Sequence, residues 1–203
     1  MHTPDHYKNE NLEELKEFIS KNAFGILVNQ TNGRPWATHI PLELDVDPQG
    51  KDILVGHIAK ANPQWQYFKE DEEVLAIFNG PHSYISSSWY KDEEVPTWNY
   101  IAVHVYGKIK ILDKAALLES LHKLVDKYEK SSEQPVSIDK LSEATMKQIV
   151  GVVGFQIDIT EIQATYKLSQ TRPEDHSQII DQLEKTNNQG SKDVAHCMKH
   201  LKK

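Results

Sequence analysis

The chain has 203 residues and a formal net charge of −7, and 38% of its residues are hydrophobic. This length suits one domain with elaborations. The acidic balance argues against non-specific nucleic-acid binding, which depends on Lys and Arg neutralising phosphates. No apolar run approaches the roughly 18 residues that a membrane span needs. We therefore expect a domain with a single core and no membrane span.

The N-terminal residues and the single cysteine indicate the cellular compartment in which we expect the protein. Met1–His6 carries neither the basic nor the apolar segment of an export signal. Cys197 is the only cysteine, so no disulfide can form within the chain. A reducing cytoplasm is the simplest location for such a protein. Motifs of the HExxH, CxxC, P-loop and G-x-S-x-G types are absent. His196 and His200 lack further ligands at a suitable spacing, so we predict no metal site.

The first third of the chain predicts a helix followed by an antiparallel meander. Apolar residues recur at helical spacing between Asn11 and Lys21. Asn32-Gly33 is a strong hairpin signal because both residues tolerate positive φ. Pro41 indicates an edge position or a bulge, because proline cannot donate to a ladder. The strands expected here cover residues 24–28, 36–44 and 52–59.

The remaining two thirds predict further strands with helices inserted late. A helical turn is expected after Asn62-Pro63, and Asn79–His82 reads as a breaker cluster. Further strands are expected over 73–78, 97–112 and 152–159, and helices over 117–128, 140–150 and 173–183. Residues 187–203 are polar and are expected to be frayed or disordered.

This order of elements predicts the fold class. Six or seven short antiparallel strands with late helices are typical of a barrel-like sheet. We expect a mainly β (α+β) protein with peripheral helices. No linker divides the chain, so residues 1–183 are expected to form a single domain, and residues 184–203 a polar C-terminal tail.

Lys60 lies where the third predicted strand ends and a helical turn begins near Asn62. Free backbone N–H groups and a cation at such a turn can bind an anion. The alternative is a capped helical turn with a solvated lysine, and the local sequence leaves both open.

Two aromatic segments are further candidates. Residues 79–90 (NGPHSYISSSWY) mix hydroxyls and aromatic rings, which is typical of ligand-binding loops but also of an anchored surface loop. Trp98 can stack on a flat ring, although a lone tryptophan is more often a core residue. No catalytic residue is predicted.

Four segments together resemble the PaiB family of FMN-binding negative transcriptional regulators. They are residues 57–65, residues 79–90, residues 95–107 (VPTWNYIAVHVYG) and residues 167–172 (KLSQTR). The resemblance runs from the Pro4-Asp5-His6-Tyr7 start to about Leu183. Ser87 stands where the family's NGPHSYIS segment continues with proline.

The resemblance implies a fold, a cofactor and a set of site residues. The implied fold is an antiparallel FMN-binding split β-barrel, and the protein is implied to be a homodimer with flavin at the subunit interface. Lys60 matches the position that holds the flavin phosphate, with Asn62 close by. Thr38, His39 and Ile40 match the strand that meets the edge of the flavin ring. The remaining implied site residues are Trp98, Asn99, Lys167, Gln170 and Arg172.

The implied function is negative regulation of transcription, which in relatives concerns protease synthesis and sporulation. The sequence contains no recognisable DNA-reading helix, so any effect on DNA can be indirect. Two alternatives stay open on the sequence: a flavin-dependent oxidoreductase acting on a small molecule, and a split-barrel protein that binds or degrades haem.

Overall fold

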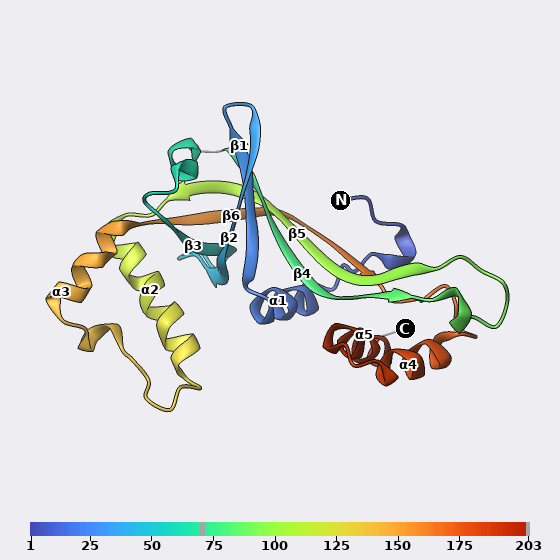
Figure 1. The fold of residues 1–203 in the computed structure, drawn as a ribbon. Helices are drawn as coiled ribbons and strands as arrows, with labels where there is room; N and C mark the ends of the chain where they lie inside the picture. Colours follow the sequence, from blue (N-terminus) through green and yellow to red (C-terminus); the bar gives the residue numbers. More distant parts are fainter. Residues whose placement is uncertain (70–71, 202–203) are drawn as a thin grey trace. The chain divides into compact units, whose positions relative to one another are not determined.

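The structure is a computed structural model that describes residues 1–69 and 72–201. Six antiparallel strands close into a barrel in the order β1-β2-β3-β6-β5-β4 (Figure 1). The strands are β1 (Phe24–Thr31), β2 (Arg34–Val46), β3 (Asp52–Ala59), β4 (Glu73–Ile85), β5 (Thr97–Ile111) and β6 (Val152–Lys167). The α-helices are α1 (Leu12–Lys21), α2 (Lys114–Glu129), α3 (Glu143–Met146), α4 (His176–Lys185) and α5 (Gln189–Lys199). Short 3-10 helices are η1 (Asp5–Tyr7), η2 (Pro63–Tyr67), η3 (Ser87–Trp89), η4 (Ile138–Lys140) and η5 (Lys147–Gly151).

The chain divides into two compact units. The barrel unit comprises Phe18–Ile77 and Val105–Ile162, and the terminal unit comprises Met1–Glu17, Phe78–His104 and Gln163–Lys203. Strands β4, β5 and β6 each contribute residues to both units. The proposed domain boundary at residue 183 stays a prediction.

Each unit has its own apolar interior. In the barrel unit, Phe68 packs edge-on against Phe155, with ring centroids 5.4 Å apart. In the terminal unit, α4 and α5 lie side by side (Figure 1). The fully buried side chains of the barrel unit include Leu27, Leu42, Leu54, Phe155 and Ile157, and those of the terminal unit include Phe78, Ile85, Ile179, Leu183 and Val194. Burying this apolar surface is the main force that holds each unit together.

Several local predictions are confirmed. Strand β3 has the predicted bounds, and the predicted turn joins β1 to β2 with φ of 52° at Asn32 and 74° at Gly33. Positive φ at both positions is the type I′ arrangement that suits the twist of a two-residue hairpin. Alternate residues of β5 are buried from Asn99 to Ile109, as its alternation predicts.

Other local predictions are wrong. Residues 79–82 do not end a strand, because β4 continues through Gly80 and Pro81 to Ile85. The helix expected over 140–150 is broken into η4, α3 and η5. Residues 187–203 were expected to be frayed, but residues 189–199 form α5; residues 202–203 lie outside the described residues. Within the terminal unit, this helix buries Val194, Ala195 and Met198, an apolar stripe that the polar composition of the tail concealed.

Gly107 generates a first prediction, because β5 and β6 approach each other closely at this residue. A Cβ at position 107 would lie 2.5 Å from the carbonyl oxygen of Asp158 and 2.5 Å from Ile157 Cγ2. The backbone of Asp158 cannot rotate away from the added methyl group as a flexible side chain can. Gly107→Ala should therefore lower the free energy of unfolding by about 2 kcal/mol or more. Chemical denaturation measures the change. Gly151→Ala is the matched control, since nothing lies within 4 Å of its Cβ position, and equal stability of the two variants would contradict the close approach.

Candidate functional site

The barrel contains a gap in the hydrogen-bond ladder between β2 and β3. β2 pairs with β1 over its whole Arg34–Pro41 stretch, but it pairs with β3 only from Leu42 to Val46. The ladder ends at the Leu42–Gly56 pair, and the next residue of β2 on this edge is Pro41. Proline has no N–H to donate. The prediction of an edge position for Pro41 is therefore confirmed, and this residue explains where the two strands part.

The register shows which backbone groups face the gap. Leu42 N donates to Ala23 O at 2.8 Å, so the backbone groups of every second residue before Leu42 point toward β1. Those of Ala37 and His39 point the other way. Lys60 N donates to Gly151 O at 2.8 Å, so by the same alternation the N–H groups of His57 and Ala59 point toward β2. Two strands thus present backbone donors to the same gap.

A buried amide ties η2 to β1 and β2 beside this gap. The Gln64 side chain is fully buried. Its Nε2 donates to Asn29 Oδ1 at 3.0 Å and to the carbonyl oxygen of Leu27 at 3.3 Å, and its Oε1 accepts from the Thr38 hydroxyl. A buried amide is costly unless it is paired, so this network fixes the position of η2.

Asn62 joins the same network and caps η2. Its Oδ1 accepts from Gln64 N at 3.0 Å, and its Nδ2 donates to Thr38 Oγ1 at 3.0 Å. The helical turn predicted after Asn62-Pro63 is confirmed, with Asn62 at the N-cap and Pro63 at the start. Thr38 and Asn62, both predicted as site residues, are therefore brought together here.

Lys60 lies on the exposed turn between β3 and η2. Its backbone is held at both ends, since its N–H binds Gly151 and its carbonyl oxygen accepts from Trp65 Nε1 at 2.9 Å. Within residues 1–69 and 72–201, the Lys60 ammonium makes no hydrogen bond or ion pair. A fixed backbone with an uncommitted cation suits the anion-binding role predicted for this residue.

His39 and Ile40 lie on opposite faces of β2. Ile40 is buried, whereas the His39 side chain is exposed and lies near Phe24, with ring centroids 6.4 Å apart. The backbone of His39 faces the gap, whereas the backbones of Thr38 and Ile40 pair with β1. Among these three predicted residues, His39 is the one that offers free backbone groups to a ligand.

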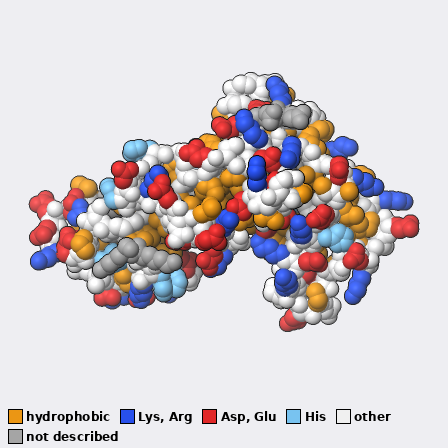
Figure 2. All heavy atoms as spheres, turned by 180° about the vertical axis from the view of Figure 1, so that it is seen from behind, with side chains coloured by type: hydrophobic (Ala, Val, Ile, Leu, Met, Phe, Trp, Pro, Cys, Tyr) orange, Lys and Arg blue, Asp and Glu red, His pale blue; other side chains and the backbone are white. Residues whose placement is uncertain are grey.

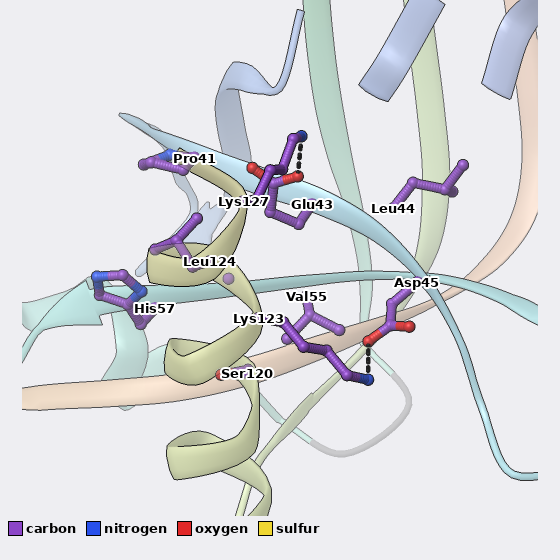
Figure 3. Close-up of a pocket in the computed structure, with 11 residues that line it drawn as sticks. Pro41, Glu43, Leu44, Asp45, Val55, His57, Ser120, Lys123, Leu124 and Lys127 are labelled. Carbon is purple, nitrogen blue, oxygen red and sulfur yellow. Dashed lines mark hydrogen bonds and ion pairs between the residues drawn. The ribbon is translucent and has the colours of Figure 1, made fainter. Parts of the chain in front are cut away.

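A small pocket of about 130 Å³ lies on the outer face of β2 and β3, next to Pro41 and under α2 (Figure 3). Two ion pairs hold α2 there: Lys127 Nζ lies 2.6 Å from Glu43, and Lys123 Nζ lies 2.7 Å from Asp45. Asp113 caps the N-terminus of this helix, and its side chain accepts from Ala116 N at 2.8 Å. The two lysines are four residues apart and the two carboxylates two apart, which places each pair on one face of its element.

Burial and nearby carboxylates shift the pKa values of three groups around this pocket. The hydrogen bond with Asp45 raises the pKa of Lys123. Tyr128 donates its hydroxyl to Glu43 Oε1 at 2.8 Å; burial and this carboxylate raise its pKa to about 12. His57 lines the same pocket, and burial lowers its pKa from 6.5. The imidazole is therefore neutral at physiological pH.

The terminal unit holds the other five predicted residues. Trp98 is exposed, with its ring centroid 5.6 Å from His82 and 6.2 Å from Tyr84. Asn99 points to the opposite face of β5 and is fully buried. Its Nδ2 donates to Ser169 Oγ at 2.9 Å. Trp98 is thus free to meet a ligand, whereas the Asn99 amide is already bonded within the unit.

The three predicted residues at and beyond the end of β6 also have partners. Lys167 donates to the Thr97 hydroxyl, and desolvation lowers its pKa. Gln170 folds back on the backbone, where its Oε1 accepts from Leu168 N at 2.7 Å. Arg172 pairs with Glu94 and lies 4.7 Å above the Tyr90 ring. These contacts hold the 167–172 segment to the start of β5 within the terminal unit.

Two features that shape this region were not predicted from the sequence. Gln64 organises the turn that carries Lys60, and only its position two residues after an N-cap asparagine could have suggested it. The ion pairs between α2 and β2 follow from two lysines four residues apart and two carboxylates two residues apart. The sequence could have suggested them only once the two elements were known to pack together.

The sequence profile described as "Putative FMN-binding domain" matches residues 1–161. The chain belongs to this family. It is similar to the protease synthase and sporulation protein PAI 2 of Bacillus subtilis (strain 168), with 46% identity over 200 residues that cover 98% of this chain and 96% of that protein. This agrees with the resemblance to PaiB proteins noted in the sequence.

Solved structures show the fold of this family member. The flavocytochrome Anf3 of Azotobacter vinelandii is similar, with a TM-score of 0.63 and 16% identity, covering 81% of this chain and 72% of that one. A FAD- and heme-binding protein of Mycobacterium smegmatis gives a TM-score of 0.62 and 14% identity, covering 79% and 73%. The predicted fold class, an antiparallel split β-barrel with helices, is confirmed.

His57 generates a prediction about pH. Its folded-state pKa lies below 6.5, so below about this pH the unfolded chain binds more protons than the folded one. Stability should therefore fall as the pH drops through this range. The slope should be shallower in His57→Gln, though not zero, because burial also lowers the pKa of His104. Denaturant titrations across the acidic range measure it. His2→Gln, at an exposed position, is the control. An unchanged slope in His57→Gln would show that the lowered pKa of His57 does not contribute to this pH dependence.

Proposed function

We propose that this protein is an FMN-binding regulatory protein of the PaiB type that acts in the cytoplasm as a homodimer. The family match over residues 1–161 carries the proposal, and the similarity of almost the whole chain to the Bacillus subtilis protein supports it. In this role it lowers transcription of its target genes, directly or through a partner. Bound FMN would supply a redox-active ring.

The residues around the ladder gap fit FMN. A phosphate monoester carries about −1.5 to −2 charges near neutral pH. Lys60 offers an uncommitted ammonium, and the backbone donors of Ala59 and His57 face the same gap. The free backbone groups of Ala37 and His39 can bind the polar edge of the flavin ring. Lys60 would hold the phosphate, with Asn62 and Thr38 supporting the turn. The buried side chain of Ile40 would anchor β2 in the core.

Five further residues are assigned to the flavin by the resemblance alone, which places them at an interface between two subunits. Trp98 would cover the flavin ring, and Asn99 would orient the strand that carries it. The others are Lys167, Gln170 and Arg172.

Direct DNA binding is expected to be weak. The net charge is −7, and basic and acidic side chains are intermingled over the face shown in Figure 2. Affinity for DNA comes largely from basic residues that neutralise phosphates. Regulation through a partner or through the flavin therefore fits this surface better than direct DNA reading. Among the described residues, no helix has the length and apolarity needed to cross a bilayer.

Lys60→Ala tests the phosphate contact. Hydrogen bonds to charged groups contribute about 1.5–3 kcal/mol, so the variant should bind FMN about ten- to a hundredfold more weakly. Its fold should be intact, because the Lys60 side chain is exposed. Titration followed by flavin fluorescence gives the two affinities.

Lys114→Ala is the matched control, since Lys114 is an exposed lysine at the first residue of α2. It should bind FMN as the wild type does. Equal affinities of the wild type and Lys60→Ala would place the phosphate elsewhere, and Ser86–Ser88 would then be the next segment to test.

The homodimer is tested by light scattering. A flavin ring bound at the edge of a small barrel needs a cover, and the resemblance assigns that cover to a second subunit. We expect a mass near twice the 23.3 kDa of one chain at micromolar concentration. A mass of a single chain, with FMN bound, would show that one subunit suffices.

A further inference from the structure

A helix packed on a sheet rarely leaves a void larger than a water molecule beneath it, and α2 departs from this rule. The pocket of about 130 Å³ under α2 is lined by eleven described residues, all of them within the barrel unit (Figure 3). Leu117, the buried residue of this helix, packs on Gly154 of β6, where an added Cβ would lie 2.8 Å from its Cδ1. The stretch of α2 that follows, from Ser120 to Lys127, borders the pocket.

The pocket lies over the part of β2 and β3 that is paired. Glu43 of β2 pairs with Val55 of β3, and both residues line the pocket. The last pair before the ladder gap is Leu42–Gly56, and the gap proposed to hold flavin begins at Pro41. The pocket and the gap therefore adjoin, but they use different stretches of the same two strands.

The formal charges that line this pocket cancel. Among its eleven described lining residues, the charged ones are two lysines and two carboxylates, which form the pairs Lys127–Glu43 and Lys123–Asp45. The His57 imidazole beside them is neutral at physiological pH. A ligand with a net charge would leave one charge uncompensated in a partly desolvated site, which is costly. The lining therefore favours a ligand whose net charge is zero.

Both lysines of the pocket have a donor left over. A lysine ammonium has three N–H groups. Lys127 donates to its paired carboxylate and to the carbonyl oxygen of Ser20 at 3.0 Å. Lys123 donates to its paired carboxylate, and its Nζ lies 3.1 Å from Glu119 Oε1. Among residues 1–69 and 72–201, one N–H of each ammonium is therefore unused.

The opposite wall of the pocket has acceptors left over. A carboxylate can accept about four hydrogen bonds. Glu43 accepts from its lysine and from the Tyr128 hydroxyl, and Asp45 accepts from its lysine and from Val46 N at 2.9 Å. The His57 ring makes no hydrogen bond or ion pair with the part of the chain that the structure describes. The pocket thus places unused donors on α2 opposite unused acceptors on β2.

We propose that this pocket binds a small zwitterion, a free amino acid with a short side chain. The ligand carboxylate would accept the unused N–H groups of Lys123 and Lys127. Its ammonium group would donate to the unused acceptor sites of Glu43 and Asp45. Charged partners of both signs suit a zwitterion better than an uncharged molecule, because hydrogen bonds to charged groups are stronger when both partners carry charge.

The volume of the pocket limits the size of this ligand. A protein cavity of about 150 Å³ can hold benzene, which has six heavy atoms. The pocket of about 130 Å³ should therefore hold a ligand of that size or slightly smaller, which matches glycine or alanine. The side chains of Leu124 and Val55 in the lining offer apolar contact to a single methyl group.

The test uses L-alanine and the full chain, with and without FMN. Calorimetry and ligand-observed NMR compare alanine with propionate, which lacks the ammonium group, and with ethylammonium, which lacks the carboxylate. Alanine should bind in both conditions, and each analogue should bind about tenfold or more weakly, because it loses hydrogen bonds to charged groups. The pocket does not use Lys60, so a failure of the proposed flavin site would leave this result unchanged.

Three variants locate the binding. Ser120→Leu fills the pocket while both ion pairs remain, and it should weaken alanine binding by about tenfold or more. Ala115→Leu adds the same side chain at an exposed position of α2 and should bind alanine as the wild type does. Lys127→Gln leaves one excess negative charge in the lining, so ethylammonium should then bind at least as tightly as alanine. A lysine that only holds α2 in place would not produce this reversal.

Any one of several results would overturn the inference. The first is no saturable binding of alanine at millimolar concentration, and the second is an analogue that binds the wild type as tightly as alanine does. Wild-type alanine affinity in folded Ser120→Leu, or a preference for alanine that survives in Lys127→Gln, would place the ligand elsewhere. Alanine binding that FMN abolishes would assign the pocket to the flavin. Thermal melts show which variants keep the fold, and Lys127→Gln decides the matter if Ser120→Leu does not.

Discussion

The site depends on one buried amide. Gln64 is fully enclosed, so each of its polar atoms must find a partner inside the protein. Asn29, Leu27 and the Thr38 hydroxyl supply them, and this pins η2 against β1 and β2. The turn before η2 then has little freedom, and it is this turn that carries Lys60. A flexible lysine could bind an anion as well, but it would lose more conformational entropy in doing so.

The second constraint is Pro41. Two strands stay paired as long as both donate backbone hydrogen bonds to each other. Proline lacks the N–H donor, and it lies at the residue where β2 and β3 part. The gap leaves N–H groups of both strands without a strand partner among the described residues. Such groups are costly if they stay buried and dry, and they are useful where a ligand with acceptor atoms binds. Pro41 therefore weakens the sheet and, at the same place, leaves backbone N–H groups available to a ligand.

Local sequence signals predicted the parts of the fold that local physics decides. Asn32-Gly33 specified its turn because few other residues accept positive φ twice in a row. Pro41 indicated an edge for a reason intrinsic to proline. The signals failed where tertiary packing overrode them: β4 runs through Gly80-Pro81, and α5 forms from a polar segment because Val194, Ala195 and Met198 become buried within the terminal unit. The role of Gln64 could not be read from the sequence, since a glutamine is buried only when its partners are already in place.

Comparing FMN with riboflavin tests most directly the proposal that Lys60 binds the phosphate of FMN. Riboflavin has the same ring and lacks the phosphate, so calorimetry of both ligands isolates the phosphate contribution. The wild type should prefer FMN by about tenfold or more, and Lys60→Ala should bind the two ligands with nearly equal affinity. A variant that keeps the full wild-type preference for FMN would contradict the account, because another group would then hold the phosphate.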